Sequence, residues 1–445
     1  MNPRIDNDRP GSSNCAVHNV INGKALSDIE LDVLMAMNKQ YAQAMMGGKH
    51  QIISTGFDGR SIESHQFESL GEFKNRFLHV PPIAGMNQGE AWQKWPGKRY
   101  YSEGIAFNPA VDKCSKNQYN LFRGYTKQPI EGDVTPFIDH VTQVICAGDM
   151  ISAKYVLQFF AHLLQKPDEK PSVAIVMKSI EGTGKGALIQ PFMAMCGEYA
   201  TQTNGAYLVT GRFNSVVANK LLIFGDEVDL TDAKSADKLK ALISEPTVMI
   251  ERKGLDAIPV GSYTRFVFAS NMDTVLKAGS RERRYLVLEP SPEFAQDSGY
   301  FKRYFDWLNN DGAAHLMHYL LTLDITDFDP RKAPSTQALL DEKLASLPMP
   351  LAFMYEELCK DKPFNGMVRP EPNDIQNMFS LFLESNGERQ TAAQMRSSVG
   401  KMLSSLAIKS IGRAGRGQYY DFSELEAIKQ SFANRLGQAI SELFY

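Results

Sequence analysis

Between residues 171 and 290 the chain alternates short apolar runs with longer stretches of helical periodicity. The apolar runs are rich in β-branched and aromatic residues and read "SVAIVMKS", "KLLIFGDEV", "TRFVFASN" and "RRYLVLE". Continuous apolar strands of this kind are typical of a parallel sheet covered by helices on both faces. The pattern therefore predicts an α/β domain with a mostly parallel sheet.

The flanking regions follow other patterns. Residues 1–132 are mixed, because "SDIELDVLMAMNKQYAQAMM" has helical periodicity and "HQIIST" reads as a strand, and we expect this region to be mainly helical. Residues 133–170 read as two amphipathic helices. Helical patterns after the strands extend the parallel-sheet domain over 171–345. The Pro-broken "LASLPMPLAF" reads as a linker to a small helical module at 350–445.

Composition narrows the class of protein. The 445 residues allow about three domains at roughly 150 residues each. The net charge is −3, so a nucleic-acid site would have to be a local patch. The five cysteines lack metal-ligand spacing, and we expect free thiols. No apolar run reaches the length of about 18 residues that a membrane-spanning helix needs. We therefore expect a cytoplasmic protein without membrane contact.

A glycine-rich loop joins the first apolar strand to a helix. It comprises Glu181, Gly182, Thr183, Gly184, Lys185 and Gly186. Glycines let backbone N–H groups turn onto phosphates, and Lys185 would reach the β- and γ-phosphates. The phosphate-loop pattern normally has Gly at 179 and Ser or Thr at 186, but here these are Ser179 and Gly186. A solvated glycine turn is the alternative.

Carboxylates follow the next strand. Asp226 and Glu227 end the run "LLIFGDE". Carboxylates at a strand's carboxyl end bind Mg²⁺ and activate water, so Asp226 is the candidate metal ligand and Glu227 the candidate general base. A solvated acidic loop is the alternative.

Two further elements continue the series. Asn271 ends the run "TRFVFASN", where its amide would hold the γ-phosphate or the attacking water, although an isolated Asn there is usually a turn former. Arg281, Arg283 and Arg284 precede the last strand. Such an arginine would stabilise the transition-state charge on a neighbour's γ-phosphate, or belong to a surface basic cluster.

Four elements in this order resemble the superfamily 3 helicases, which are ring-forming AAA+ ATPases, and most nearly the helicase part of phage and plasmid primase–helicases. The resemblance rests on "EGTGKG", "GRFNSVVANKLLIFGDEVD" and "RRYLVLE" and covers about residues 171–290. A weaker likeness extends upstream through "RYYSEGIAFNP", "NQYNLFRGY" and "FFAHLLQKPDEKP", which would make 133–170 a collar-like segment.

The resemblance implies ATP and Mg²⁺ as cofactors and a ring homo-oligomer, usually a hexamer, around DNA. It makes Asn271 the sensor residue and Arg283 or Arg284 the finger acting on a neighbouring subunit. "TVMIERKG" and "LDAIPV" read as a hairpin with a tight turn, matching a hairpin that projects into the ring's channel. Arg252 and Lys253 are therefore candidate DNA contacts, against an ordinary exposed hairpin.

The C-terminal module contains a second basic hairpin. "RSSVGKMLSSLAIKSIGRAGRGQYYDF" reads as a helix and a Gly-rich hairpin with Arg413 and Arg416 at its turn, an order typical of a winged helix. These residues would contact DNA or another subunit. The only dense acidic cluster nearby, in "DITDFDP", reads as a surface loop, so we expect any primase to be a separate protein or a missing segment.

The leading hypothesis is an ATP-dependent DNA helicase, a replicative motor of a phage or mobile element acting in the bacterial cytoplasm on a single strand or fork. A P-loop loader or remodeller that does not unwind is the second. A DNA-binding replication scaffold with a decayed ATPase is the third, supported by Gly186 alone.

Overall fold

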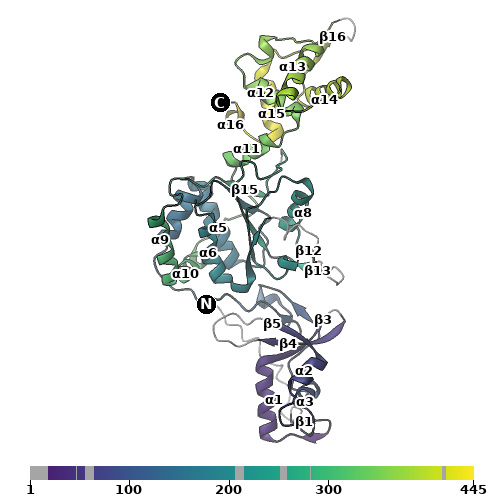
Figure 1. The fold of residues 1–445 in the computed structure, drawn as a ribbon, viewed down its shortest axis with the longest axis vertical. Coiled ribbons are helices and arrows are strands. Elements are labelled where there is room, and N and C mark those ends of the chain that lie inside the picture. Colours follow the sequence, from purple (N-terminus) through teal and green to yellow (C-terminus); the bar gives the residue numbers. More distant parts are fainter. Residues whose placement is uncertain are drawn as a thin grey trace.

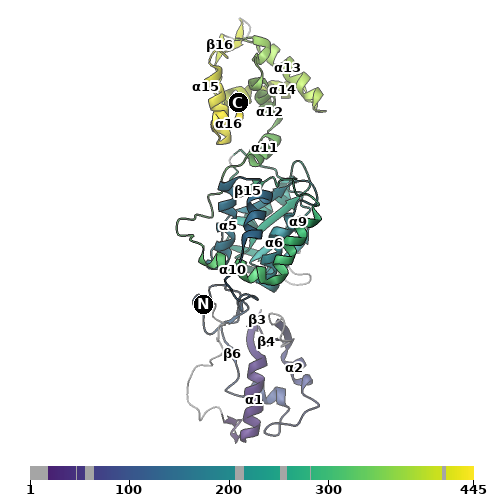
Figure 2. The same ribbon diagram turned by 90° about the vertical axis from the view of Figure 1, so that its left-hand side faces the viewer.

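The chain folds into three bodies that follow one another along its long axis (Figure 1, Figure 2). The computed structural model describes residues 19–46, 48–55, 65–205, 215–250, 258–280, 282–412 and 417–444. Strands and helices of the N-terminal body lie at one end, a helix-covered sheet lies in the middle, and a helical body lies at the other end.

The N-terminal body is a small sheet with helices against it. Its elements are β1 (Val20–Ile21), β2 (Lys24–Ala25), α1 (Asp28–Gln40), β3 (Tyr41–Met46), β4 (Lys49–Thr55), β5 (His65–Ser69), α2 (Leu70–Arg76), α3 (Gln88–Lys94), β6 (Tyr100–Tyr101), β7 (Ile105–Ala106), η1 (Val111–Lys113) and β8 (Tyr119–Asn120). The main sheet has the order β5–β4–β3–β6, in which β3 runs antiparallel to β4 and parallel to β6.

The expectation of a mainly helical N-terminal region is therefore wrong, although the predicted strand "HQIIST" is confirmed within β4. The helical pattern of α1 continues in sequence into "YAQAMM", but these residues form β3. Ala and Met favour helices in isolation. Here the pairing of β3 with strands on both sides, and the burial of Ala42 and Ala44, override that preference.

Two helical segments connect this body to the central sheet, as predicted. α4 (Thr135–Asp139) runs directly into the π-helical stretch η2 (His140–Ile145), and α5 (Met150–Gln165) follows. Asp149 caps α5 through its side chain, which accepts the N–H of Ile151. His140 begins the π-helical stretch and is fully buried.

The central body contains five parallel strands in the order β10–β11–β14–β9–β15. The strands are β9 (Ala174–Lys178), β10 (Ala200–Asn204), β11 (Leu222–Asp226), β14 (Arg265–Ser270) and β15 (Tyr285–Leu288). The helices and turns are α6 (Lys185–Cys196), η3 (Gly197–Tyr199), η4 (Ser215–Val217), α8 (Ala233–Ser244), α9 (Ser298–Trp307), η5 (Leu308–Gly312), α10 (Ala313–Thr322) and α11 (Gln337–Ala345). The predicted mostly parallel sheet is thus confirmed.

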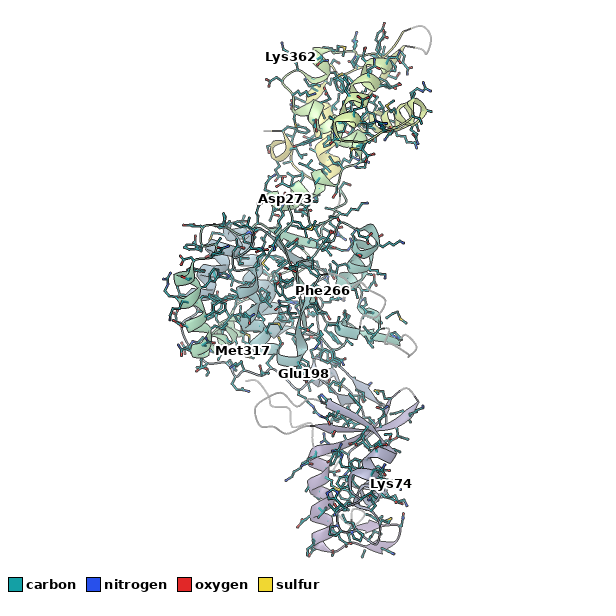
Figure 3. All side chains as sticks on the ribbon, in the orientation of Figure 1. Lys74, Glu198, Phe266, Asp273, Met317 and Lys362 are labelled. Atoms are coloured by element: carbon teal, nitrogen blue, oxygen red, sulfur yellow. The ribbon has the colours of Figure 1, made fainter. Side chains whose placement is uncertain are left out.

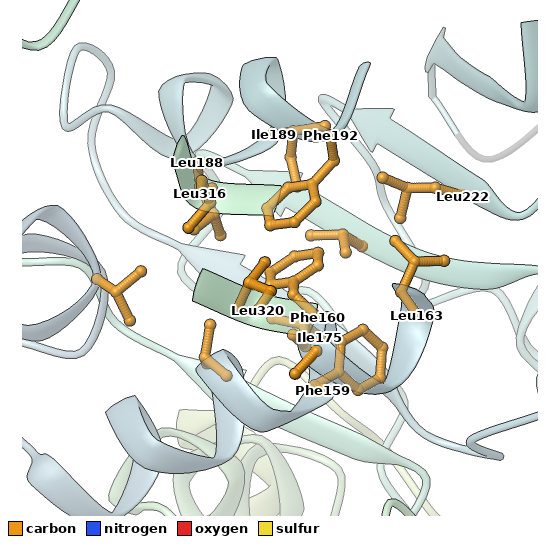
Figure 4. Packing of buried hydrophobic residues seen from close by; sticks show 14 of the residues in the cluster. Phe159, Phe160, Leu163, Ile175, Leu188, Ile189, Phe192, Leu222, Leu316 and Leu320 are labelled. Carbon is orange, nitrogen blue, oxygen red and sulfur yellow. The ribbon is translucent and has the colours of Figure 1, made fainter. Parts of the chain in front are cut away.

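Hydrophobic cores cover both faces of this sheet, as its continuous apolar strands require. On one face α5, α6 and α10 pack against the strands, with Phe160 and Phe192 stacked at 3.9 Å between ring centroids (Figure 4). On the other face residues of α8 and α11 form a second core. Four strands were predicted; β10, "ATQTN", was missed because this edge strand is polar and carries no apolar run.

The predicted hairpin between α8 and β14 is confirmed by the antiparallel pairing of β12 (Thr247–Ile250) with β13 (Ile258–Gly261). Residues 251–257, which connect the two strands in sequence, lie outside the described residues, and the predicted tight turn with Arg252 and Lys253 falls there. The structure thus supports the hairpin without describing its candidate DNA contacts.

The C-terminal body is a helical cluster with one hairpin. It comprises α12 (Met349–Cys359), η6 (Pro363–Gly366), α13 (Pro372–Ser385), α14 (Ala392–Ser405), β16 (Ser410–Gly412), β17 (Gln418–Tyr420), α15 (Leu425–Leu436) and α16 (Ile440–Leu443). The predicted order of helix and Gly-rich hairpin is confirmed by α14 and the antiparallel pair β16–β17. Arg413 and Arg416 lie outside the described residues.

Helix α11 joins the central and C-terminal bodies through packing. Ala338 and Leu339 belong to the core on one face of the central sheet, whereas the neighbouring Leu340 belongs to the C-terminal core. Residues 346–348 alone separate α11 from α12. The junction is therefore a shared helix, and the segment read as a linker is mostly helical.

Candidate nucleotide site

The glycine-rich loop occupies the turn between β9 and α6. Gly182 and Gly184 have φ angles of +79° and +88°, which residues other than glycine rarely adopt. A Cβ on Gly184 would lie 2.6 Å from His140 Cε1, and one on Gly182 would lie 2.7 Å from Gln296 Cγ. Both glycines are thus required by backbone conformation and by space, and the loop delivers the chain into the first turn of α6.

Lys185 points back across this loop. Lys185 is 8% exposed, and its Nζ donates to the carbonyls of Ser179 and Ile180 at 2.7 and 2.9 Å. Nζ also donates to Asn271 Oδ1 at 2.8 Å, across 86 positions of sequence. Burial lowers the pKa of Lys185, while the charges of Asp226 and Glu181 act in the opposite direction. Lys185, Asn271 and a nearby carboxylate therefore share one site.

The strand order explains this convergence. β14 lies between β9 and β11, so the carboxyl ends of all three meet at one edge of the sheet. Ser179 donates its N–H to the carbonyl of Ser270, and Val228 donates to that of Ala269. These backbone bonds fix the start of the loop and the residue after Glu227 to the end of β14.

The two carboxylates differ in their surroundings. Asp226 is half-buried and accepts weakly from Gln202 Nε2 at 3.4 Å. Glu227 is exposed and has a φ of +52°, a left-handed conformation that costs about 1–2 kcal/mol for a residue with a Cβ. Its backbone N–H donates to Asp226 Oδ1 at 3.1 Å.

Thr183 is not placed to replace the missing hydroxyl at position 186. It is 1% exposed, and its Oγ1 is bonded to Ser179 Oγ at 2.7 Å and to the carbonyl of Ile180 at 3.2 Å. No group of three or more His, Cys, Asp or Glu side chains forms a metal site within the described ranges. Mg²⁺ commonly takes one or two carboxylates together with phosphates and water, and Asp226 fits that ligand set.

His140 supports the loop and was missed by sequence reasoning. Its Nε2 lies 3.0 Å from the carbonyl oxygen of Gly184, and its Nδ1 lies 2.9 Å from the Tyr300 hydroxyl. Because the carbonyl only accepts, Nε2 carries the proton and Nδ1 accepts from Tyr300. Burial lowers the pKa of His140 to about 4, so it is neutral at pH 7. A short sequence motif could not have predicted these contacts, because Gly184 and Tyr300 lie 44 and 160 positions from His140.

The arginine pair lies apart from this cluster. Arg283 and Arg284 precede β15, at the amino ends of the parallel strands, whereas Lys185 follows the carboxyl end of β9. Arg283 is exposed, and Arg284 contacts the buried Glu282 at 3.5 Å. Arg281 lies outside the described residues. The chain therefore does not bring these arginines to its own loop.

The acidic cluster after α10 forms a surface turn, as predicted. Asp324 accepts from the N–H and hydroxyl of Thr326, and Asp329 accepts from the N–H of Arg331. These bonds lower the pKa of both carboxyls. Asp327 completes the turn and is exposed. The carboxylates thus stabilise their own turns.

The chain is similar in sequence to a phage protein and to a family model. The chain is 26% identical over 235 residues to a protein named DNA Primase-polymerase from Nitratiruptor phage NrS-1, covering 52% of this chain and 30% of that protein. It thus spans about a third of the length of this relative. A family model described as a family of unknown function (DUF5906) matches residues 177–284, which include the loop, Asp226, Glu227, Asn271 and the arginine pair.

The fold is similar to solved structures of the NrS-1 C-terminal region. One apo structure has a TM-score of 0.67 at 13% identity and covers 87% of this chain and 97% of that one. Another, described as the A form, has a TM-score of 0.67 at 14% identity with the same coverage. At this identity the likeness shows the fold. The chain is therefore related in sequence to a phage replication protein and shares the fold of its C-terminal region. No helix in the described part of the chain is long and apolar enough to cross a membrane.

Proposed function

We propose that this chain is an ATP-driven motor of phage DNA replication, a helicase with a P-loop AAA+ domain. The observation that carries the proposal is the bond between Lys185 Nζ and Asn271 Oδ1, formed beside Asp226 at the carboxyl edge of a parallel sheet. A cation, an amide and a carboxylate held together at such an edge are the groups that bind and hydrolyse a nucleoside triphosphate. The sequence similarity to a protein named DNA Primase-polymerase from a phage supports DNA as the molecule on which the motor acts.

The site's own residues supply the steps. The Lys185 ammonium donates to two loop carbonyls, to the Ser179 hydroxyl and to Asn271, so its protons are held by protein acceptors in the absence of nucleotide. When a triphosphate enters, Lys185 exchanges carbonyl partners for phosphate oxygens, and the loop's N–H groups hold the β-phosphate. Asp226 is the ligand for Mg²⁺, which would neutralise phosphate charge. Glu227 takes the proton of the attacking water, and Asn271 orients that water or the γ-phosphate.

Ring assembly would complete the site. Arg283 or Arg284 would act on a γ-phosphate bound by the adjacent subunit, because both lie at the end of the sheet opposite to the loop of their own chain. Arg252 and Lys253, which lie between β12 and β13 in sequence, would contact a single strand in the channel of the ring, and Arg413 and Arg416 would contact the fork.

ATP hydrolysis with and without single-stranded DNA, together with strand displacement on a forked duplex, tests the proposal. We expect Lys185→Ala to lower turnover by at least about 100-fold, because it removes a charge aimed at the transferred phosphoryl group. Glu227→Gln should abolish turnover while a fluorescent ATP analogue still binds. Lys302→Ala, which changes an exposed lysine on α9, is the control and should behave as wild type.

The alternatives give other results. DNA-stimulated hydrolysis without strand displacement would identify a loader or remodeller. DNA binding with no hydrolysis by the wild type would identify a scaffold. Normal turnover by Glu227→Gln would remove Glu227 from the role of base.

A further inference from the structure

A carboxylate on the helix shared by two bodies reaches the neighbourhood of the nucleotide site. Glu342 of α11 is 1% exposed, and Oε2 accepts from the N–H of Leu276 at 2.8 Å and of Val275 at 3.0 Å. Oε1 lies 3.4 Å from Lys178 Nζ, which is also nearly buried. Burying an ionised carboxylate is costly unless it is paired and hydrogen-bonded, and here the two N–H groups and the ammonium supply both.

Each partner of Glu342 leads to a motif of the nucleotide site. Lys178 is the last residue of β9, directly before Ser179, whose carbonyl accepts from Lys185. Val275 and Leu276 belong to the segment 271–278, which begins at Asn271. Lys178 Nζ also donates to the carbonyl of Asp273 at 3.3 Å, so the lysine joins this segment to the start of the loop.

The same segment is bonded to the acidic motif. The N–H of Leu230 donates to the carbonyl of Val275 at 2.9 Å, and the N–H of Lys277 donates to the carbonyl of Leu230 at 3.2 Å. Leu230 is three residues beyond Glu227. From the other side, Ser346 at the end of α11 accepts the N–H of Ala278 at 3.0 Å. The segment 271–278 is therefore held between the acidic motif and α11.

The other side of α11 belongs to the C-terminal body. Leu340 packs in that body's core, and Lys343 Nζ donates to the carbonyl of Leu436 on α15 at 3.3 Å. Figure 3 places Asp273 at the end of the central body that faces the C-terminal body, and Glu198 at the opposite end. One helix thus contacts both the C-terminal core and the segment that starts at Asn271.

From these contacts we infer that Glu342, on the helix shared with the C-terminal body, is a positioning residue for the nucleotide site, which sets Asn271 relative to Lys185. The inference rests on the proposed function for its kinetic meaning. Removing the carboxylate leaves Lys178 and two buried N–H groups without a charged acceptor, so the segment 271–278 and the start of the loop lose their common anchor.

Glu342→Gln tests this inference, because glutamine keeps the size of the side chain but loses its charge and one acceptor. Glu357→Gln is a matched control: Glu357 is 2% exposed, accepts the N–H of Phe364 at 2.8 Å and contacts Lys360, all within the C-terminal body. We expect Glu342→Gln to lower kcat for ATP about tenfold with KM changed less than about threefold, since the loop's backbone still binds phosphate. Glu357→Gln should keep wild-type kcat despite a similar loss of thermal stability.

Hydrogen exchange without nucleotide gives a second, independent measurement. Glu342→Gln should speed exchange in peptides covering both 271–278 and 179–185, whereas Glu357→Gln should affect only the C-terminal body. If Glu342→Gln does not accumulate as folded protein, Lys178→Met interrupts the same link from the other side. The double variant should be no slower than the more impaired single variant.

Two results would overturn the inference. One is faster exchange at 275–278 alone with wild-type kcat, which would make Glu342 merely structural. The other is an equal loss of kcat in both variants, which would reflect general destabilisation. If the wild type neither binds nor hydrolyses ATP, the proposed function fails, and the exchange experiment still decides whether Glu342 links the two segments.

Discussion

His140 contacts the phosphate loop from outside the sequence motifs. Its neutral imidazole donates to Gly184, the residue whose left-handed conformation starts α6, and Tyr300 fixes the tautomer. A protonated imidazole would place a second N–H against the Tyr300 hydroxyl and a charge in a buried site. The loop should therefore be sensitive to acid through this residue.

The pH dependence of stability tests the role of His140. Its folded pKa of about 4 lies below the ordinary value of 6.5, so the unfolded chain binds the proton more readily. Stability is therefore lost as pH falls from about 6.5 towards 4. We expect His140→Gln, which can keep both hydrogen bonds but does not titrate, to lose about 2 kcal/mol less than wild type between pH 7 and pH 5 in urea unfolding. Equal losses would show that His140 is already protonated or exposed in the folded chain.

At the scale of elements, one buried arginine joins α5 to the sheet. Arg265 begins β14 and is 0% exposed, and its guanidinium donates to the carbonyl of His162 in the last turn of α5 and to those of Lys166 and Glu169, which follow the helix. Burial lowers the pKa of Arg265 to about 10, so it remains charged at pH 7. A fixed cation at a helix C-terminus satisfies its last carbonyls and complements the helix dipole.

Replacing this arginine should cost much more than replacing an exposed one. We expect Arg265→Lys to lower the free energy of unfolding by about 3 kcal/mol, because lysine cannot present a planar fork to several carbonyls. Arg76→Lys, at an exposed pair with Glu68, should change it by less than about 0.5 kcal/mol. Denaturant unfolding of both variants measures the difference, and similar values would show that the carbonyls find other partners.

The strands differ in whether the sequence alone could predict them. β9, β11, β14 and β15 were predictable because burial on both faces makes each an unbroken apolar run. β10 is a polar edge, and β3 has a helix-favouring sequence that pairing overrides. These misses reflect tertiary contacts that no short window of sequence contains.

At the scale of the whole molecule, the candidate site likewise contains residues that the sequence predicted and residues that it did not. Lys185, Asp226 and Asn271 were predictable because parallel strands bring their ends to one edge, so motif order implies proximity. His140 and Glu342 were not, because their partners lie 44 and 66 positions away on elements whose packing only the fold defines. The sequence thus indicates the chemical groups, and the fold adds those that hold them in place.

The position of the arginine pair makes a prediction about assembly. Because Arg283 and Arg284 lie at the amino ends of the strands and the loop at the carboxyl ends, an arginine finger would have to act on a second copy of the chain. We expect Arg283→Ala or Arg284→Ala to lower turnover by about 1,000-fold if that residue is the finger.

Mixing two inactive variants tests whether the arginine acts on the loop of a second copy of the chain. Subunits with Lys185→Ala keep the arginines but lack a working loop, and subunits with the arginine variant keep the loop. Mixing the inactive proteins should restore partial ATP turnover, which should be maximal near equal amounts, because some interfaces then pair an intact loop with an intact arginine. No restoration at any ratio, under conditions where mixed oligomers are shown to form, would mean that the arginines do not act between subunits and that Arg284 serves only its contact with Glu282.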